Sequence, residues 1–195
     1  MQDLTEGIAR FQEDVFPGKA ELFAQLAAHH APHTLFISCS DARVVPELIT
    51  ATEPGDLFVI RTAGNLVPAF TPEADGIAAS IEYAVAALEV KDIVICGHSA
   101  CGAMTSLAQG HDLSGVPAVA AWLRHADTSV ARTSAAGNIH ELVRQNVLAQ
   151  LANLATHPSV ARAAAEQKLA MHGWVYDIAS GHVEDLTGPK AALVA

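Results

Sequence analysis

Three side chains that could bind one transition-metal ion lie in two short segments of this chain. Cys39 begins the segment Cys39–Arg43, and His98 and Cys101 follow far downstream, three residues apart. Two thiolates and an imidazole are ligands typical of zinc. Structural zinc sites are usually closed by four Cys or His side chains, whereas catalytic sites keep one position open for water or substrate. A set of three protein ligands therefore indicates an enzyme.

A carboxylate and a guanidinium follow the first of these ligands. In an extended segment alternate side chains share one face, so Cys39, Asp41 and Arg43 are expected to point the same way. Arg43 stays protonated and can hold a carboxylate through two parallel hydrogen bonds. If Asp41 bound the metal instead, no position would remain for water. We therefore expect Arg43 to keep the site open and Asp41 to orient the reacting hydroxide; an ordinary salt bridge is the alternative for this pair.

The cysteines admit a second interpretation, because free cysteine is among the most buried residue types. Cys96 ends an apolar run, and core packing is favoured there over metal binding. For Cys39 and Cys101, metal binding is favoured over core packing, because together with His98 they form a typical set of zinc ligands. The total of three cysteines is odd, which favours reduced thiols over disulfides and a cytoplasmic location.

The composition limits the partners that this chain can have. It has 195 residues, of which 51% are hydrophobic, and we expect residues 1–195 to form a single domain. A net charge of −10 would repel a phosphate backbone. The first residues lack the build of a signal peptide, and no apolar run approaches the length of a membrane span. Neither a nucleic-acid nor a membrane partner is expected.

Short apolar runs predict the strands that must position these residues. Thr34–Ser38, Leu57–Arg61 and Ile93–Cys96 each resemble a buried parallel strand. Apolar residues at helical spacing from Ile77 to Leu88 predict a crossover helix between the last two. Ligands in open α/β sheets collect at the carboxyl ends of the strands, where both ligand segments would lie. The sequence predicts an α/β fold with a mostly parallel central sheet flanked by helices.

The remaining segments predict a helical arm, covering helices and an edge hairpin. Residues 5–28 are periodic, with a break at Pro17–Gly18, and precede the first strand. Trp174–Ile178 and His182–Glu184 predict a strand and a short hairpin near the C-terminus. Three further helices are expected to cover the sheet, over Pro117–His125, Ile139–Ala155 and Ser159–Leu169.

The two ligand segments together resemble the signature of a known family. Cys39-Ser40-Asp41-Ala42-Arg43 with His98-Ser99-Ala100-Cys101-Gly102 is similar to the motif of β-class carbonic anhydrases, zinc enzymes that interconvert carbon dioxide and bicarbonate. The likeness extends from Phe11-Gln12 to the segment His172–Tyr176. Segments such as Glu53–Arg61 resemble the bacterial members of the class found in cyanate operons.

Carried over by position, this resemblance implies one Zn2+ per chain and a defined site. The metal ligands would be Cys39, His98 and Cys101. The catalytic pair would be Asp41 and Arg43. The implied activity is the reversible hydration of carbon dioxide to bicarbonate and a proton by zinc-bound hydroxide, the reaction of a zinc lyase.

The resemblance also implies residues that contact the substrate. Gly102 would offer its backbone N–H, and Phe58, Ala63 and Tyr83 would line an apolar carbon dioxide cleft from a neighbouring subunit. Core packing is an equal alternative for Tyr83, which lies on an otherwise apolar helix face. His30 stands where relatives carry a Gln near the substrate, and it could shuttle protons; a solvated surface side chain is the alternative.

Partners and regulation follow from the same resemblance. It implies a homodimer or higher homo-oligomer in which the arm of residues 1–30 packs on a partner subunit, and a functional link to a cyanate-degrading enzyme. A regulatory bicarbonate pocket of some members is disfavoured, because Phe36 replaces its Trp although Arg61 and Tyr176 are present. Two other functions stay open: a hydrolase of carbon disulfide or carbonyl sulfide at the same metal, and a non-catalytic zinc-stabilised module closed by Asp41.

Overall fold

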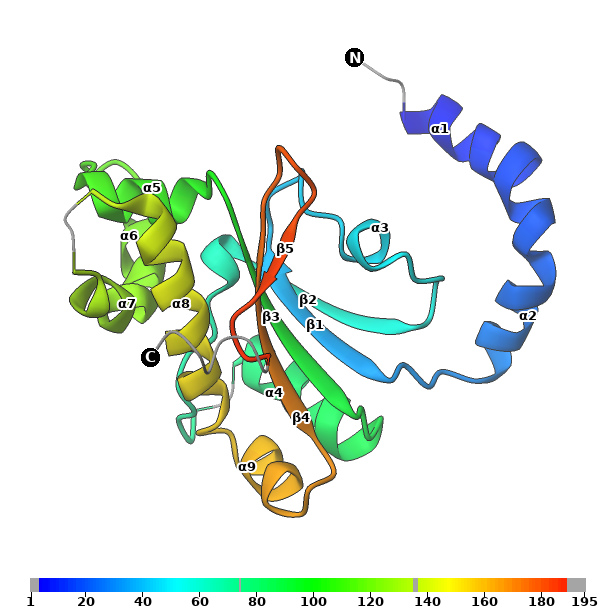
Figure 1. Cartoon of the computed structure of the whole chain (residues 1–195). Coiled ribbons are helices and arrows are strands. Elements are labelled where there is room, and N and C mark those ends of the chain that lie inside the picture. Colours follow the sequence, from blue (N-terminus) through cyan, green and yellow to red (C-terminus); the bar gives the residue numbers. More distant parts are fainter. Residues whose placement is uncertain (1–3, 74, 135–136, 189–195) are drawn as a thin grey trace. The chain divides into compact units, whose positions relative to one another are not determined.

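A five-stranded sheet forms the centre of the second of two units, Met1–Ala31 and Pro32–Ala195, in this computed structural model (Figure 1). The structure describes residues 4–73, 75–134 and 137–188. The strand order is β2-β1-β3-β4-β5; the first four run parallel, and β5 is antiparallel to β4. This arrangement confirms the predicted mostly parallel α/β sheet and its edge hairpin. The strands are β1 (Thr34–Cys39), β2 (Leu57–Thr62), β3 (Asp92–His98), β4 (Ala170–Tyr176) and β5 (Val183–Asp185).

Helices connect these strands, and several differ from the sequence-based prediction. The helix expected to reach Leu169 ends at Ala165, because Gln167 adopts a left-handed conformation with φ 56°. The sequence did not predict three short helices, α3 (Pro46–Thr50), α5 (Gly102–Gln109) and α7 (Asp127–Arg132), because their few turns show no clear apolar period. Within the described ranges, no helix combines the length and hydrophobicity needed to cross a bilayer. The helices are α3 (Pro46–Thr50), α4 (Gly76–Glu82), α5 (Gly102–Gln109), α6 (Pro117–Leu123), α7 (Asp127–Arg132), α8 (Ile139–Leu154) and α9 (Pro158–Ala165), with short turns η3 (Ala63–Asn65), η4 (Tyr83–Ala87) and η5 (Arg124–Ala126).

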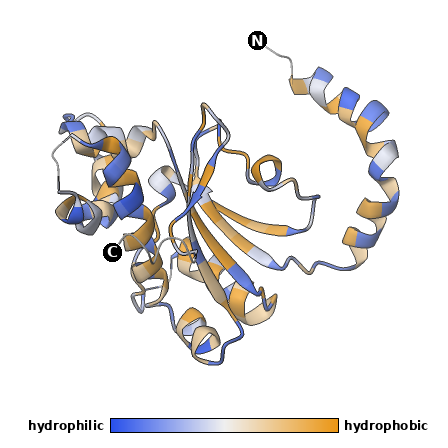
Figure 2. Ribbon diagram, in the orientation of Figure 1, coloured by the Kyte–Doolittle hydropathy of each residue, from blue (hydrophilic) through white to orange (hydrophobic). Residues whose placement is uncertain are grey.

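The main core lies on one face of the sheet. Side chains alternate along a strand, so Leu35 and Ile37 of β1 face the helices, whereas Phe36 points to the opposite face. The helix-facing cluster includes Val143 and Val147 of α8, and Phe36 packs in a smaller cluster with Cys96 of β3. Figure 2 shows hydrophobic residues concentrated along the central strands.

Two strand glycines let α8 lie close against the sheet. A Cβ at Gly97 of β3 would fall 2.8 Å from Val147 Cγ2, and one at Gly173 of β4 would fall 2.9 Å from Leu151 Cδ1. Real Cβ atoms do not approach other atoms so closely, so a larger residue would push the helix away. Because Gly97 directly precedes His98, this contact also determines where the end of β3 lies.

The first unit is helical from Leu4 to Ala28. It consists of α1 (Leu4–Arg10), η1 (Phe11–Val15), η2 (Phe16–Lys19) and α2 (Ala20–Ala28). Pro17, which has no N–H to donate, lies at the start of the 3-10 turn η2. Within the unit, the rings of Phe11, Phe16 and Phe23 lie 5.5 to 6.3 Å apart, yet Phe11 and Phe16 remain about 40% exposed.

Candidate metal centre

The carboxyl ends of two adjacent parallel strands bring the three predicted ligands together. Cys39 ends β1, His98 ends β3, and Cys101 is the residue before α5. One sulfur or nitrogen atom of each lies within 4.8 Å of the others, and all three side chains are buried. The chain turns between His98 and Cys101, with Ala100 in a left-handed conformation (φ 53°).

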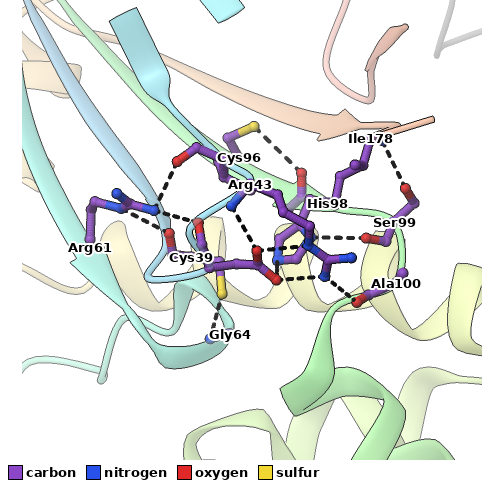
Figure 3. Close-up of polar contacts among 12 residues, drawn as sticks. Cys39, Arg43, Arg61, Gly64, Cys96, His98, Ser99, Ala100 and Ile178 are labelled. Atoms are coloured by element: carbon purple, nitrogen blue, oxygen red, sulfur yellow. Dashed lines mark hydrogen bonds and ion pairs between the residues drawn. The ribbon is translucent and has the colours of Figure 1, made fainter. Parts of the chain in front are cut away.

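His98 presents one ring nitrogen to the other two ligands. Its Nδ1 lies 2.9 Å from the backbone carbonyl of Ser99; a carbonyl only accepts, so Nδ1 carries the proton (Figure 3). Nε2 is then an acceptor; it is fully buried and has no hydrogen-bond partner among the described residues. Asp41 Oδ2, at 3.9 Å, is too distant for a hydrogen bond. Buried polar atoms are nearly always satisfied, so this nitrogen indicates a missing ligand partner such as a metal ion.

The two thiols differ in their readiness to ionise. A hydrogen bond from the Cys101 thiol is the largest cause that lowers the pKa of Cys39 to about 4, while burial opposes it. The same contact, followed by burial, raises the pKa of Cys101. The pair therefore carries one negative charge by itself, and a bound dication would favour loss of the second proton. Two sulfurs and one imidazole nitrogen fit Zn2+.

Arg43 holds the carboxylate of Asp41 beside the ligands. Arg43 Nε donates to Asp41 Oδ1 at 2.9 Å, and Arg43 Nη2 donates to Oδ2 at 2.7 Å. These hydrogen bonds are the first cause of an Asp41 pKa well below its ordinary value. The shared face of these side chains depended on the chain staying extended past Cys39, and it does not: the chain turns at Ala42, and the Val44 N–H donates to the Asp41 carbonyl at 3.0 Å. A turn brings the ends of this short segment together more closely than alternation along a strand would.

Arg61 of β2 holds the turn that carries Asp41. Its Nε donates to the carbonyl of Cys39 at 3.1 Å, and its Nη2 donates to the carbonyls of Asp41 and Val44 at 2.6 and 2.8 Å (Figure 3). Sequence reasoning assigned this guanidinium no role in the site. A charged residue within an otherwise apolar strand run, Leu57–Arg61, is the signal that could have drawn attention to it.

A turn after β2 contacts the sulfur of Cys39 and is held by helix α8. The Gly64 N–H donates to Cys39 Sγ at 3.4 Å, with Gly64 at φ 75°. Asn146 Nδ2 donates to the Gly64 carbonyl at 2.9 Å, and its Oδ1 accepts from Ser129 and Gln150. Sequence reasoning missed this network. Asn146 and Gln150 are fully buried and four residues apart, so two polar residues on one helix face were the available signal.

The residues expected to contact substrate are only partly near the ligands. Gly102 directly follows Cys101 and has no atom within 4 Å of where a Cβ would lie. The carbonyl of Ala63 accepts from Trp122 Nε1 at 2.9 Å, beside the Gly64 turn. His30 belongs to the first unit, which is described by itself.

Phe58 and Tyr83 pack together, away from the ligands of their own chain. Their ring centroids lie 5.9 Å apart. Phe58 pairs with Leu35, whereas Cys39 pairs with Thr62. Phe58 is therefore four residues from the ligand end of the strand, roughly 13 Å at about 3.3 Å per residue. Tyr83 is 50% exposed, so the alternative of core packing is wrong for this side chain.

Comparisons with known proteins agree with this site. The family model described as carbonic anhydrase matches residues 34–183. The carbonic anhydrase of Pseudomonas aeruginosa is 53% identical over 201 residues, which cover 100% of this chain and 91% of that protein. The structure of the β-carbonic anhydrase CcaA superposes with a TM-score of 0.89 at 41% identity, covering 95% of this chain and 86% of that one.

A third comparison concerns proteins described as assemblies. The structures of two tetrameric β-carbonic anhydrases from Sordaria macrospora include a chain that is 34% identical, with a TM-score of 0.77, over 95% of this chain and 98% of that one. Family match, identity and superposition thus agree across nearly the whole length. This chain belongs to the carbonic anhydrase family and, within it, to the β class.

Proposed function

We propose that this chain catalyses the reversible hydration of carbon dioxide to bicarbonate and a proton, with one Zn2+ held by Cys39, His98 and Cys101. The observation that carries the proposal is the buried, unpartnered Nε2 of His98, which lies with two sulfurs in a set within 4.8 Å. This donor set leaves one of the usual four positions of zinc to water or substrate.

The chain's own residues would control the reacting water. Zinc, when bound, supplies a Lewis acid that brings the pKa of a coordinated water toward neutrality. Asp41 stays ionised and can only accept hydrogen bonds, so it would orient an O–H group that enters the site. Arg43 would keep both carboxylate oxygens directed and away from the metal. Gly102, exposed at the start of α5, would donate its N–H to a substrate oxygen.

The test is stopped-flow carbon dioxide hydration by protein of known zinc content. Chelation should abolish turnover, and added zinc should restore it. Cys39→Ser should lose both zinc and activity, whereas Cys96→Ala, a buried cysteine on the other sheet face, should keep both. Full turnover by the chelated protein would exclude the proposal.

Neither alternative function is supported by the relatives. The relatives reported above are named carbonic anhydrases rather than hydrolases of carbon disulfide or carbonyl sulfide. A non-catalytic zinc module closed by Asp41 would require that carboxylate to leave Arg43, to which both of its oxygens are hydrogen-bonded.

The proposed functional form is a homodimer or higher homo-oligomer. Phe58 lies four residues along β2 from the ligand end, and the half-exposed Tyr83 packs against its ring, which supports a cleft that they line in a partner subunit. The arm leaves apolar side chains exposed, including Leu4 at 82% and Ile8 at 59%, which supports packing on a partner. Size-exclusion chromatography with light scattering tests this; a monomer with full activity would exclude it.

The proposed location is the cytoplasm, and the proposed pathway link is to a cyanate-degrading enzyme. Three free, buried cysteines suit the reducing cytoplasm. The functional link to a cyanate-degrading enzyme stays a prediction of the sequence resemblance. His30 as a proton carrier stays a prediction too; His30→Gln should slow turnover at low buffer concentration, with rescue by imidazole.

A further inference from the structure

Ser99 lies between the ligands His98 and Cys101, and it connects their loop to the end of β4, a strand that contributes no ligand. Its N–H donates to the Tyr176 carbonyl at 2.9 Å, and its Oγ accepts from the Ile178 N–H at 2.9 Å. Both partners lie at the carboxyl end of β4 or just beyond it. The backbone and the side chain of Ser99 are therefore both attached to the end of β4 and the residues directly after it; Figure 3 shows the side-chain contact with Ile178.

The carbonyl of Ser99 orients a metal ligand. It accepts the Nδ1–H of His98 at 2.9 Å, which leaves Nε2 as the nitrogen directed at the two sulfurs. A histidine that binds a metal commonly donates its other ring N–H in this way, and loss of such support weakens metal binding. Movement of the Ser99 peptide would therefore turn or release the imidazole.

The peptide carbonyl of the next residue, Ala100, contacts the catalytic pair. The carbonyl of Ala100 accepts from Arg43 Nη2 at 3.1 Å, the same atom that donates to Asp41 Oδ2. Ala100 has φ 53°, a strained conformation for a residue with a Cβ, which persists only when the surroundings hold it. Ser99, the residue directly before Ala100, is hydrogen-bonded through both its backbone N–H and its side chain.

We infer that Ser99 is a positioning residue, which attaches the loop of residues 98–101 to the end of β4 and thereby directs His98 and Arg43 together. The inference rests on the proposed zinc site and goes beyond it, because Ser99 touches neither metal nor substrate. The hydroxyl is the specific element. It accepts from the Ile178 N–H, and after Ser180, the larger cause, it contributes to the lowered pKa of Asp177.

Three variants separate the hydroxyl from the general stability of the loop. Ser99→Ala removes the hydroxyl and leaves the Ile178 N–H without its acceptor. Ser99→Thr keeps the hydroxyl, and a cavity of about 260 Å³ lined by Ser99, Val143 and Val175 has room for the extra methyl group. Ser180→Ala is the matched control, since it removes the other hydroxyl on Asp177, at 2.7 Å, without touching the ligand loop.

The primary measurement is the rate of zinc loss from the purified holoprotein to a chromogenic chelator. Ser99→Ala should lose zinc about 10- to 100-fold faster than the unchanged protein. Ser99→Thr and Ser180→Ala should stay near the original rate. The visible spectrum of the cobalt-substituted protein should change in Ser99→Ala alone, because the imidazole is no longer held in one direction. Carbon dioxide hydration and thermal unfolding are recorded beside these.

Each outcome decides between the alternatives. If Ser99→Ala keeps its zinc and its cobalt spectrum while only its melting temperature falls, Ser99 is merely structural and the inference is wrong. If Ser99→Thr is as impaired as Ser99→Ala, the hydroxyl is not what positions the loop. If the unchanged protein itself binds no zinc, it is the proposed function that fails, and the two failures are distinguishable.

Discussion

Arg43 and Asp41 are joined by three hydrogen bonds across a tight turn: two from the guanidinium, at 2.9 and 2.7 Å, and one from the backbone N–H of Arg43 at 3.0 Å. The carboxylate is thus oriented by its neighbour two residues away. Both of its oxygens accept from Arg43, and Oδ2 lies 3.9 Å from His98 Nε2, beside the ligand set but too far for a hydrogen bond to it.

Asp41→Asn should therefore lower kcat/KM while leaving zinc in place. The amide has the same shape but no charge, and its NH2 group cannot accept a hydrogen bond from a reacting O–H group. Loss of a positioned acceptor typically costs about 100-fold or more in rate. Asp112→Asn is the control, because that carboxylate is exposed and bonded only to Ser114 in its own turn. Undiminished turnover by Asp41→Asn, measured at equal zinc content, would show that Asp41 has no catalytic role.

The unequal thiols predict a pH titration of the zinc-free protein. The hydrogen bond from Cys101 stabilises the charged form of Cys39, so its pKa falls to about 4. Burial raises the pKa of Cys96 to about 12, and that of Cys101 is also raised. Ultraviolet absorbance should accordingly report one thiolate per chain at neutral pH, which is lost as the pH falls through about 4.

Single cysteine variants assign that thiolate. Cys39→Ser should abolish the absorbance step, and Cys96→Ala should leave it unchanged. A chain in which no thiolate forms until the pH is well above neutral would contradict the proposed inequality. So would a chain with two thiolates at neutral pH.

Asn146→Ala should destabilise the fold through the turn that contacts Cys39. The change removes the Asn146 partner from the Gly64 carbonyl, from the Ser129 hydroxyl and from the Gln150 Nε2 group, which keeps its bond to the His125 carbonyl. We expect the free energy of unfolding to fall by about 1–3 kcal/mol, measured by urea denaturation. Gln145→Ala, at the preceding position of α8, removes a 3.3 Å bond to Glu141 and should have a much smaller effect. Equal losses for the two variants would refute the special role of Asn146.

Gly97→Ala tests the close contact between α8 and the strand that ends at His98. The new methyl group would lie 2.8 Å from Val147 Cγ2 and 3.1 Å from Val143 Cγ1, on β-branched side chains with little freedom to move. Overpacking of this kind costs about 1–3 kcal/mol of stability.

A double-mutant cycle identifies the cause of that loss. Val147→Ala removes the nearer of the two crowded methyl groups and leaves Val143 Cγ1, so the double variant should be more stable than the sum of the two single effects predicts. Gly115→Ala, which has open space around its Cβ position, should change stability little. Strict additivity of the two changes would mean that the steric contact is not responsible.

The strand ends and the ligand types could be predicted from the sequence because they depend on local pattern. Apolar runs marked β1, β2 and β3, and Cys39 and His98 follow from where such runs stop. The turn at Ala42 could not be predicted in the same way, because the residue types from Cys39 to Arg43 are compatible with both an extended and a turned chain. Hydrogen bonds to Arg61, on another strand, stabilise the turned form.

The supporting contacts had little or no local signature. Asn146 reaches Gly64 across 82 residues, and Ile178 reaches Ser99 across 79. Each of these contacts exists only because packing brings distant segments to the same end of the sheet. A single sequence shows the polar residues without showing which backbone groups they will satisfy.

The sequence by itself determined the chemistry that this protein can perform, since the types and order of Cys39, Asp41, Arg43, His98 and Cys101 specify two sulfurs, one imidazole and a paired carboxylate. Tertiary structure alone decided that His98 directs Nε2 inward, that one thiol ionises before the other, and that Ser99 joins the ligand loop to β4. The physical reason is that residue type is a property of the chain. Proton position, pKa and direction are properties of the neighbours that folding places around each group.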